Sequence, residues 1–172
     1  QTKSVVCLCP TTEANLGDGI FQLKDYVSRG GFFTIGSDSN ISIDPFEELR
    51  WLEYSQRLIH QKRNIASEES IGTGQYLFEK ILTGGALSSG QKSNGQIKEG
   101  SPANLLVLSD ENASLAGHTN ETLFDAIVFS NHGELIHKVM INGEWVNFLS
   151  QENEEIKKHK ESYSALLGRI LN

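Results

Sequence analysis

The first half of the chain repeats one pattern: a short apolar run, a polar turn, and then a segment with helical spacing of apolar residues. The two runs, SVVCL and FFTI, occupy residues 4–8 and 32–35. Apolar runs of this length are typical of parallel strands, which are covered on both faces. Strand, helix, strand and helix with short connections predict an α/β fold with two consecutive βα units of a parallel sheet or barrel.

The helical segments have clear ends. The first is predicted over residues 20–29, where two glycines stop it. The second begins at Pro45, behind the N-cap residue Asp44, and runs to about residue 61. Its apolar side chains occupy more than one side, so we expect neighbours around it. A third helix is predicted over residues 74–83, where another glycine pair ends it.

Beyond residue 90 the pattern becomes β-rich. Strands are predicted over residues 104–108, 126–129, 136–141 and 144–146. Asn142-Gly143 predicts a two-residue hairpin turn between the last two strands. A final helix is predicted over residues 151–171, with an apolar stripe in its second half. We therefore divide the chain into strand–helix units (1–90), a β-rich segment (91–150) and a C-terminal helix (151–172).

Composition excludes two classes of partner. The 172 residues carry 15 Lys and Arg against 22 Asp and Glu, a formal net charge of −7. Non-specific nucleic-acid binding needs a surplus of cations, so it is not expected. A membrane span is not expected either, because the sequence has no run of about 18 apolar residues.

The two cysteines, Cys7 and Cys9, are two positions apart in a predicted strand. A bridge between them would need strained geometry, so we expect free, buried thiols and a reducing compartment, the cytoplasm. A single Cys-x-Cys is also a weak metal signal, because a thiolate site needs further ligands.

The turn after the second strand, Gly36-Ser37-Asp38-Ser39, places a carboxylate where α/β folds carry catalytic groups. Asp38 can bind a metal through one oxygen and accept a proton through the other. Aspartate also caps turns routinely, and spacing alone favours that simpler role.

The segment after the first strand, residues 9–19, opens on the same edge if the strands are parallel. Its hydrogen-bonding side chains are candidates for a polar substrate pocket: Thr11, Thr12, Glu13 and Asn15. A long turn with side-chain caps explains them equally well.

The five histidines do not form a self-contained site. None follows a predicted strand beside Asp38, and His132 and His137 are expected to be solvated rather than to bind zinc, which usually takes three protein ligands at a catalytic site. The sequence also has no serine nucleophile elbow, phosphate-binding loop or dinucleotide fingerprint.

Three segments closely resemble the C-terminal part of the N-formimino-L-glutamate deiminases, which belong to the metal-dependent amidohydrolase superfamily. They are CPTTEANLGDGIF (residues 9–21), IGSDS (35–39) and EELRWLEY (47–54). The TEANLGDG part is specific to the deiminases. The later match, GQIKEGSPANLLVL (95–108) and VMINGEWV (139–146), is general to the superfamily.

This resemblance implies a (β/α)8 barrel whose last two strands are the runs 4–8 and 32–35, with part of a small β-sandwich and a C-terminal helix. It makes Asp38 the ligand of one divalent metal, usually zinc, and the residue that moves a proton. The implied reaction, a step of histidine degradation, converts N-formimino-L-glutamate and water to N-formyl-L-glutamate and ammonia. The parent enzyme would be a homodimer.

The chain departs from the family pattern at two positions, and it lacks the part of the pattern that carries the other site residues. Asn40 replaces a histidine after the GSDS turn, and Asn104 replaces an aspartate before a strand of the small domain. The family's metal-binding histidines and substrate-binding arginine have no counterpart here. We therefore expect this chain, as a C-terminal part, neither to retain the metal nor to hydrolyse the substrate alone, and to associate through its open strand edges.

Two alternatives stay open. One is a related deaminase that acts on an amino-heterocycle through the same chemistry. The other is a non-catalytic domain used for binding or assembly.

Overall fold

The computed structural model describes residues 4–91, 95–130, 135–146 and 154–171. The chain forms two compact units, Gln1–Ser101 with Asp110–Leu135, and Pro102–Ser109 with Ile136–Asn172. Unit 1 contains β1 (Val5–Leu8), α1 (Pro10–Leu16), α2 (Leu23–Ser28), β2 (Phe32–Ile35), α3 (Pro45–His60), α4 (Thr73–Ser88), the 3-10 turn η1 (Ala113–Leu115) and α5 (Leu123–Phe129). Unit 2 contains β3 (Leu105–Leu108), β4 (Ile136–Ile141), β5 (Glu144–Val146) and α6 (Glu154–Ile170). The sequence-based division into 1–90, 91–150 and 151–172 stays a prediction.

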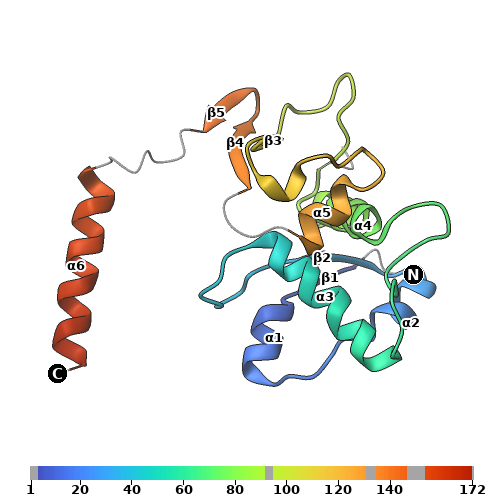
Figure 1. Ribbon diagram of the computed structural model, residues 1–172, viewed down its shortest axis with the longest axis horizontal. Helices are drawn as coiled ribbons and strands as arrows, with labels where there is room; N and C mark the ends of the chain where they lie inside the picture. The colour runs from blue at the N-terminus through green and yellow to red at the C-terminus, as the bar shows by residue number, and fades with distance from the viewer. Residues whose placement is uncertain (1–3, 92–94, 131–134, 147–153, 172) are drawn as a thin grey trace. The chain divides into compact units, whose positions relative to one another are not determined.

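The two strands of unit 1 lie side by side, as Figure 1 shows, and they are parallel. Val5 is opposite Phe32 and Leu8 is opposite Ile35. The core of the unit gathers apolar side chains from β1, β2 and the helices: Leu8, Leu23, Phe33, Leu49, Leu52, Ala66, Tyr76, Leu77 and Val128. The predicted α/β character and the parallel βα arrangement are therefore confirmed in this unit.

Helix α3 begins where the sequence predicts. The Asp44 carboxylate accepts a hydrogen bond of 2.8 Å from the Phe46 N–H, and Pro45 occupies the first turn. Leu49 and Leu52 are buried in the core. Trp51 is 43% exposed and Leu58 is 74% exposed, so part of the wide apolar surface of this helix is uncovered in the described chain.

The segment after β1 is a helix, not the polar loop that the sequence predicted. Pro10 starts α1, and the Glu13 carboxylate accepts the Cys9 N–H at 2.9 Å. Gly17 ends the helix with φ +75°, and its N–H bonds to the Glu13 carbonyl. These local caps allow a helix of only two turns in a polar sequence.

Helix α4 runs through Gly84-Gly85, where the sequence predicted its end. A Cβ at Gly84 would lie 1.9 Å from the Phe33 carbonyl oxygen, so the helix touches the backbone of β2. The Gly36 N–H bonds to Leu8, so the Phe33 carbonyl, three residues earlier in β2, points away from β1. Helix α4 therefore covers part of the edge of β2 that we expected to be open.

Residues 126–129, predicted as a strand, belong to helix α5. A four-residue apolar run has no readable period, so long-range packing decides its conformation. Ala126, Ile127 and Val128 are all buried, and Arg50 of α3 donates to the Val128 carbonyl at 2.7 Å.

Unit 2 contains the predicted hairpin. Its strands are antiparallel in the order β3-β4-β5. The turn residues Asn142 and Gly143 have φ +51° and +86°, as a type I′ turn requires. The Asn104 side chain accepts the Asn142 N–H at 2.8 Å, which ties the start of β3 to the hairpin turn.

Helix α6 corresponds to the predicted C-terminal helix. Among the described residues, no helix combines the length and the apolar character that crossing a membrane requires.

Candidate functional site

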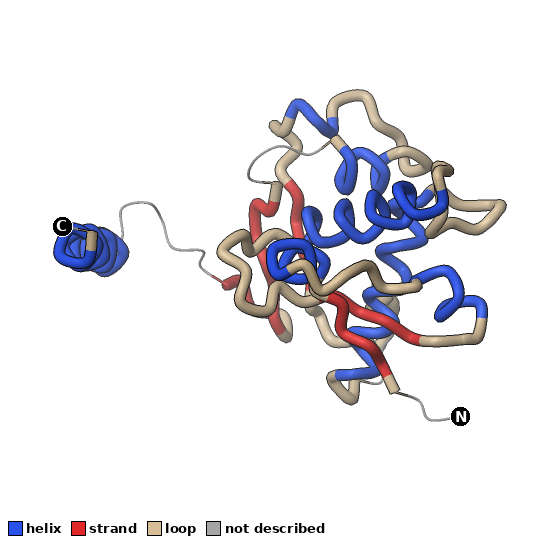
Figure 2. The backbone as a smooth tube through the Cα atoms, turned by 90° about the horizontal axis from the view of Figure 1, so that it is seen from below, coloured by secondary structure: helices blue, strands red, loops and turns tan. Residues whose placement is uncertain are grey.

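The carboxyl ends of β1 and β2 form one edge of unit 1, which we call the strand-end edge. The Gly36 N–H donates to the Leu8 carbonyl at 2.9 Å, so the parallel ladder continues to the last residue of β1. Figure 2 shows the two strands running together in unit 1. Residues 9–16 and 36–40 both leave from this edge, as the sequence predicted.

Asp38 lies in the turn that follows β2, and its side chain is exposed. Its φ is +47°, a left-handed conformation that is uncommon outside glycine, asparagine and aspartate. The Asn40 N–H closes the turn on the Ser37 carbonyl at 3.0 Å. The Asn40 side chain in turn accepts the Ser42 N–H at 2.8 Å, so Asn40 shapes the exit from this turn.

Thr11, in the first turn of α1, is buried against a residue that sequence reasoning did not identify. Its N–H donates to one Glu48 carboxylate oxygen at 3.0 Å, and its hydroxyl donates to the other. Glu48 comes from the first turn of α3 and is buried. The signals in the sequence were its helical spacing to Leu52 and its place in the EELRWLEY segment (47–54).

Thr12 connects α1 to the turn that carries Asp38. Its hydroxyl donates to the Ser37 carbonyl at 3.0 Å, and its side chain is buried. This bond joins the segments that follow β1 and β2, which are distant in the sequence.

The other two predicted pocket residues differ in their surroundings. One oxygen of Glu13 caps the start of α1 by accepting the Cys9 N–H. Asn15 is exposed on α1. Thr11, Thr12, Glu13 and Asn15 are therefore carried by one short helix, and the first three make hydrogen bonds within the chain.

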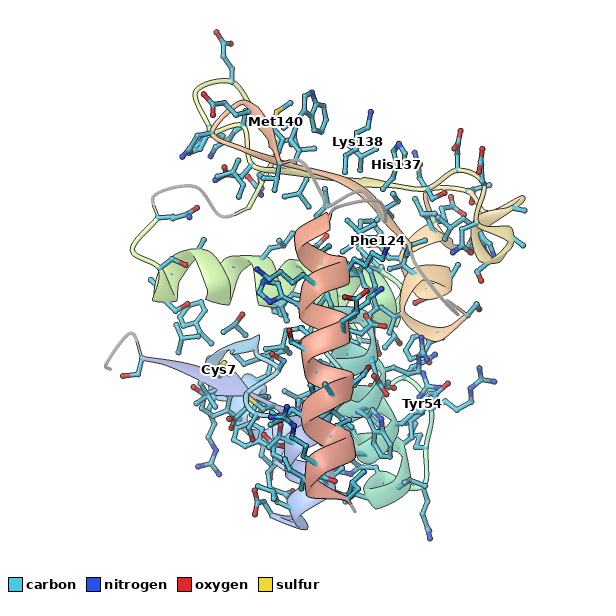
Figure 3. The ribbon with its side chains drawn as sticks, turned by 90° about the vertical axis from the view of Figure 1, so that its left-hand side faces the viewer. Cys7, Tyr54, Phe124, His137, Lys138 and Met140 are labelled. Carbon is cyan, nitrogen blue, oxygen red and sulfur yellow. The ribbon has the colours of Figure 1, made fainter. Side chains whose placement is uncertain are left out.

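The two thiols lie beside Gly36. A Cβ at Gly36 would lie 3.0 Å from the Cys7 Sγ and 3.5 Å from the Cys9 Sγ. Both cysteines are free, as expected, but Cys7 is exposed rather than buried. The reason is strand alternation, because Val6 and Leu8 face the core and Cys7 faces the other way. Figure 3 labels the Cys7 side chain on β1.

The pKa of the Cys9 thiol is raised by its surroundings at this edge. Burial, followed by the neighbouring Cys7 and the Asp38 and Glu48 carboxylates, raises its pKa from 9.0 to about 11. The thiol is therefore protonated at neutral pH, which makes it a poor metal ligand there.

The residues of this edge fit one ligand position of a metal site. Within the described ranges, no group of three or more His, Cys, Asp and Glu side chains can hold a metal ion. The exposed Asp38 carboxylate has the oxygen chemistry of a single ligand to a divalent metal. The histidines do not complete the set: His60, His118, His137 and His159 are exposed, and His132 lies outside the described residues.

A family model and two curated relatives match this sequence. The sequence model of the Amidohydrolase family matches residues 1–146. The formimidoylglutamate deiminase of Pseudomonas aeruginosa is 42% identical over 173 aligned residues, which cover all of this chain and 38% of that protein. A 5-methylthioadenosine/S-adenosylhomocysteine deaminase of Pyrococcus abyssi is 29% identical over 146 residues, which cover 83% of this chain and 32% of that protein.

Two solved structures are similar. An amidohydrolase from Brucella melitensis superposes with a TM-score of 0.79 at 32% identity, over 98% of this chain and 37% of that one. An E. coli guanine deaminase shares the fold, with a TM-score of 0.67 at 20% identity over 87% of this chain and 35% of that one. The chain spans less than two-fifths of the length of each of these relatives.

Proposed function

The chain belongs to the amidohydrolase family, and we propose that it contributes the strand-end edge to a metal-dependent enzyme that deiminates N-formimino-L-glutamate. One observation carries the proposal: identity of 42% along the whole chain to the Pseudomonas deiminase. The heterocycle deaminase from Pyrococcus is only 29% identical over a shorter stretch, so the amino-heterocycle alternative is not favoured. A purely non-catalytic domain is also disfavoured, because these relatives are named as enzymes.

In this proposal, β1 and β2 are the last two strands of a (β/α)8 barrel, and β3, β4 and β5 belong to a small β-sandwich. The parallel register of β1 and β2, with α2 between them, supports the first part. The antiparallel order β3-β4-β5 supports the second. The boundaries after residues 90 and 150 are part of the same proposal.

The proposed reaction adds water to the formimino carbon and breaks its bond to the terminal nitrogen. Ammonia leaves and N-formyl-L-glutamate remains, in a step of histidine degradation. One oxygen of Asp38 would hold a divalent metal, zinc in our proposal, which supplies a Lewis acid and lowers the pKa of water. The second oxygen of Asp38 accepts a proton from the attacking water and delivers it to the departing nitrogen. Its exposure at the strand-end edge supports this role.

Helix α1 is the proposed wall of the substrate pocket. It carries Thr11, Thr12, Glu13 and Asn15 next to the Asp38 turn. The exposed Asn15 amide is free to meet a polar substrate, and the bonds of Thr11 and Thr12 to Glu48 and Ser37 hold the helix in place.

The remaining ligands of the proposed site would come from outside these 172 residues, since the relatives are more than twice as long. We propose that the chain alone neither retains the metal nor turns over substrate, and that the whole protein is a cytoplasmic homodimer. The free thiols support the reducing compartment. The exposed Trp51 and Leu58 on α3 support association with further protein surface.

The test is turnover by the protein from the complete reading frame that contains this chain. Ammonia release is measured with N-formimino-L-glutamate, guanine and S-adenosylhomocysteine, before and after chelation and zinc restoration, with the 172-residue chain assayed in parallel. We expect zinc-restored turnover of the first substrate by the complete protein alone. Preference for either heterocycle, or no metal-dependent turnover of any of the three, would contradict the proposal.

A further inference from the structure

A buried carboxylate that belongs to neither segment of the strand-end edge is hydrogen-bonded to the first of them, the start of α1. Glu48 is 1% exposed and lies in the first turn of α3. Its Oε2 accepts the Thr11 N–H at 3.0 Å, and its Oε1 accepts the Thr11 hydroxyl. Among the residues that the structure describes, no Lys, Arg or His forms an ion pair with it.

Such a carboxylate is costly to bury, because it loses hydration and gains no cation from the described part of the chain. An apolar side chain would fill the same place on α3 at lower cost. The two hydrogen bonds from Thr11 to Glu48 instead fix the orientation of Thr11, because they hold both its backbone and its side chain. This pattern indicates that Glu48 places the start of α1.

One further hydrogen bond connects α1 to the turn that carries Asp38. Thr12, which follows Thr11, donates its hydroxyl to the Ser37 carbonyl at 3.0 Å. Ser37 directly precedes Asp38, which has a left-handed φ of +47°. A continuous series of bonds therefore runs from Glu48 through the first turn of α1 to the backbone of the Asp38 turn.

We propose that Glu48 is a positioning residue that holds the Asp38 carboxylate in place by fixing α1 against the Asp38 turn. This inference rests on the proposed role of Asp38 as a metal ligand. Glu48 itself touches neither metal nor substrate. It acts through Thr11 and Thr12, which are therefore positioning residues as well.

The same helix provides a matched control. Glu53 is 0% exposed, and it accepts the N–H groups of Ile65 and Ala66 at 3.0 and 2.9 Å. Arg57 also donates to it, at 2.8 Å. Glu53 thus holds the segment that follows the far end of α3. Its replacement perturbs a buried carboxylate on α3 without touching the strand-end edge.

The experiment uses the protein from the complete reading frame and four variants, E48Q, T12V, T12S and E53Q. Each is examined for its Zn²⁺ dissociation constant against a chromophoric chelator, for kcat and KM with N-formimino-L-glutamate, and for its thermal unfolding midpoint. We expect E48Q and T12V to weaken Zn²⁺ binding by about 10- to 100-fold and to lower kcat by a similar factor, with KM changing less than about threefold.

The controls separate positioning from stability. T12S keeps the hydroxyl and should recover most of the zinc affinity and kcat that T12V loses. E53Q should lower the unfolding midpoint while zinc affinity and kcat stay within about twofold of wild type. If E48Q lowers only the unfolding midpoint, as E53Q does, the proposal is wrong.

Three further outcomes are informative. Should E48Q fail to fold, T12V tests the last link, because it removes only the bond to Ser37. Zinc affinity and kcat at wild-type levels in T12V would show that Glu48 does not act on Asp38 through Thr12, and the proposal would be wrong. Should the wild type bind zinc but not turn over N-formimino-L-glutamate, the proposed substrate fails while the zinc affinities of the variants still decide this proposal. A wild type that binds no zinc overturns it.

Discussion

Gly84 of α4 lies against the carbonyl oxygen of Phe33 in β2. A Cβ at Gly84 would be 1.9 Å from that oxygen, far inside van der Waals contact. The contact is on the side of β2 that faces away from β1. Nearby, the Thr34 hydroxyl donates to the Ile81 carbonyl at 3.3 Å, which adds a second link between β2 and α4.

Replacing Gly84 with alanine is expected to destabilise the fold by about 2–3 kcal/mol, because the methyl group must push α4 away from the strand. Gly85→Ala is the matched control. Its Cβ would lie 3.4 Å from the Thr34 Oγ1, and alanine improves helix propensity by about 1 kcal/mol. Urea unfolding of both variants measures the difference. Equal stabilities would show that the close approach at Gly84 does not constrain the fold.

Asp38→Asn is expected to reduce kcat of the complete enzyme by about 10²- to 10⁴-fold, because the amide cannot take up a proton from water. The substitution should leave the thermal unfolding midpoint near that of wild type, since Asp38 is exposed and asparagine tolerates its positive φ. Asp25→Asn, on an exposed residue of α2, is the control and should keep full activity. Unchanged turnover in D38N would remove Asp38 from the chemistry.

The Cys9 thiol should make stability depend on alkaline pH. The unfolded chain releases this proton near pH 9.0, whereas the folded chain keeps it until about pH 11. Between these values the unfolded state binds fewer protons, so the free energy of unfolding falls as pH rises. Urea unfolding at pH 8 and pH 10 should show a larger loss for wild type than for C9A. The opposite order would mean that burial does not raise the pKa of this thiol.

Gly143→Ala is expected to destabilise the β4–β5 hairpin by about 1 kcal/mol, because alanine is strained at φ +86°. Asn142→Gly is the control, since glycine accepts the positive φ at the preceding turn position without strain. Hydrogen exchange of the β4 and β5 amides would report the change locally. Faster exchange in N142G than in G143A would contradict the assigned turn.

The sequence alone determined the elements whose signals are local. The runs at 4–8 and 32–35, the Asp44-Pro45 start of α3 and the Asn142-Gly143 turn all correspond to elements that the structure contains. These features depend on caps, turn residues and short apolar runs, which act within a few residues. The parallel pairing of the first two strands followed from the helical connection between them, so the strand-end edge and the exposed position of Asp38 could be expected.

Only the tertiary structure decided which segments bury each other. The run at 126–129 became helical because α3 and α4 enclose it, and α4 continued through Gly84 because a strand carbonyl occupies the space of a side chain. Glu48 looked like any acid in a first helical turn, yet it is buried against Thr11, 37 positions away in the sequence. Spacing within one segment carries no information about such partners, because the free energy that selects them comes from contacts that exist only after the chain has folded.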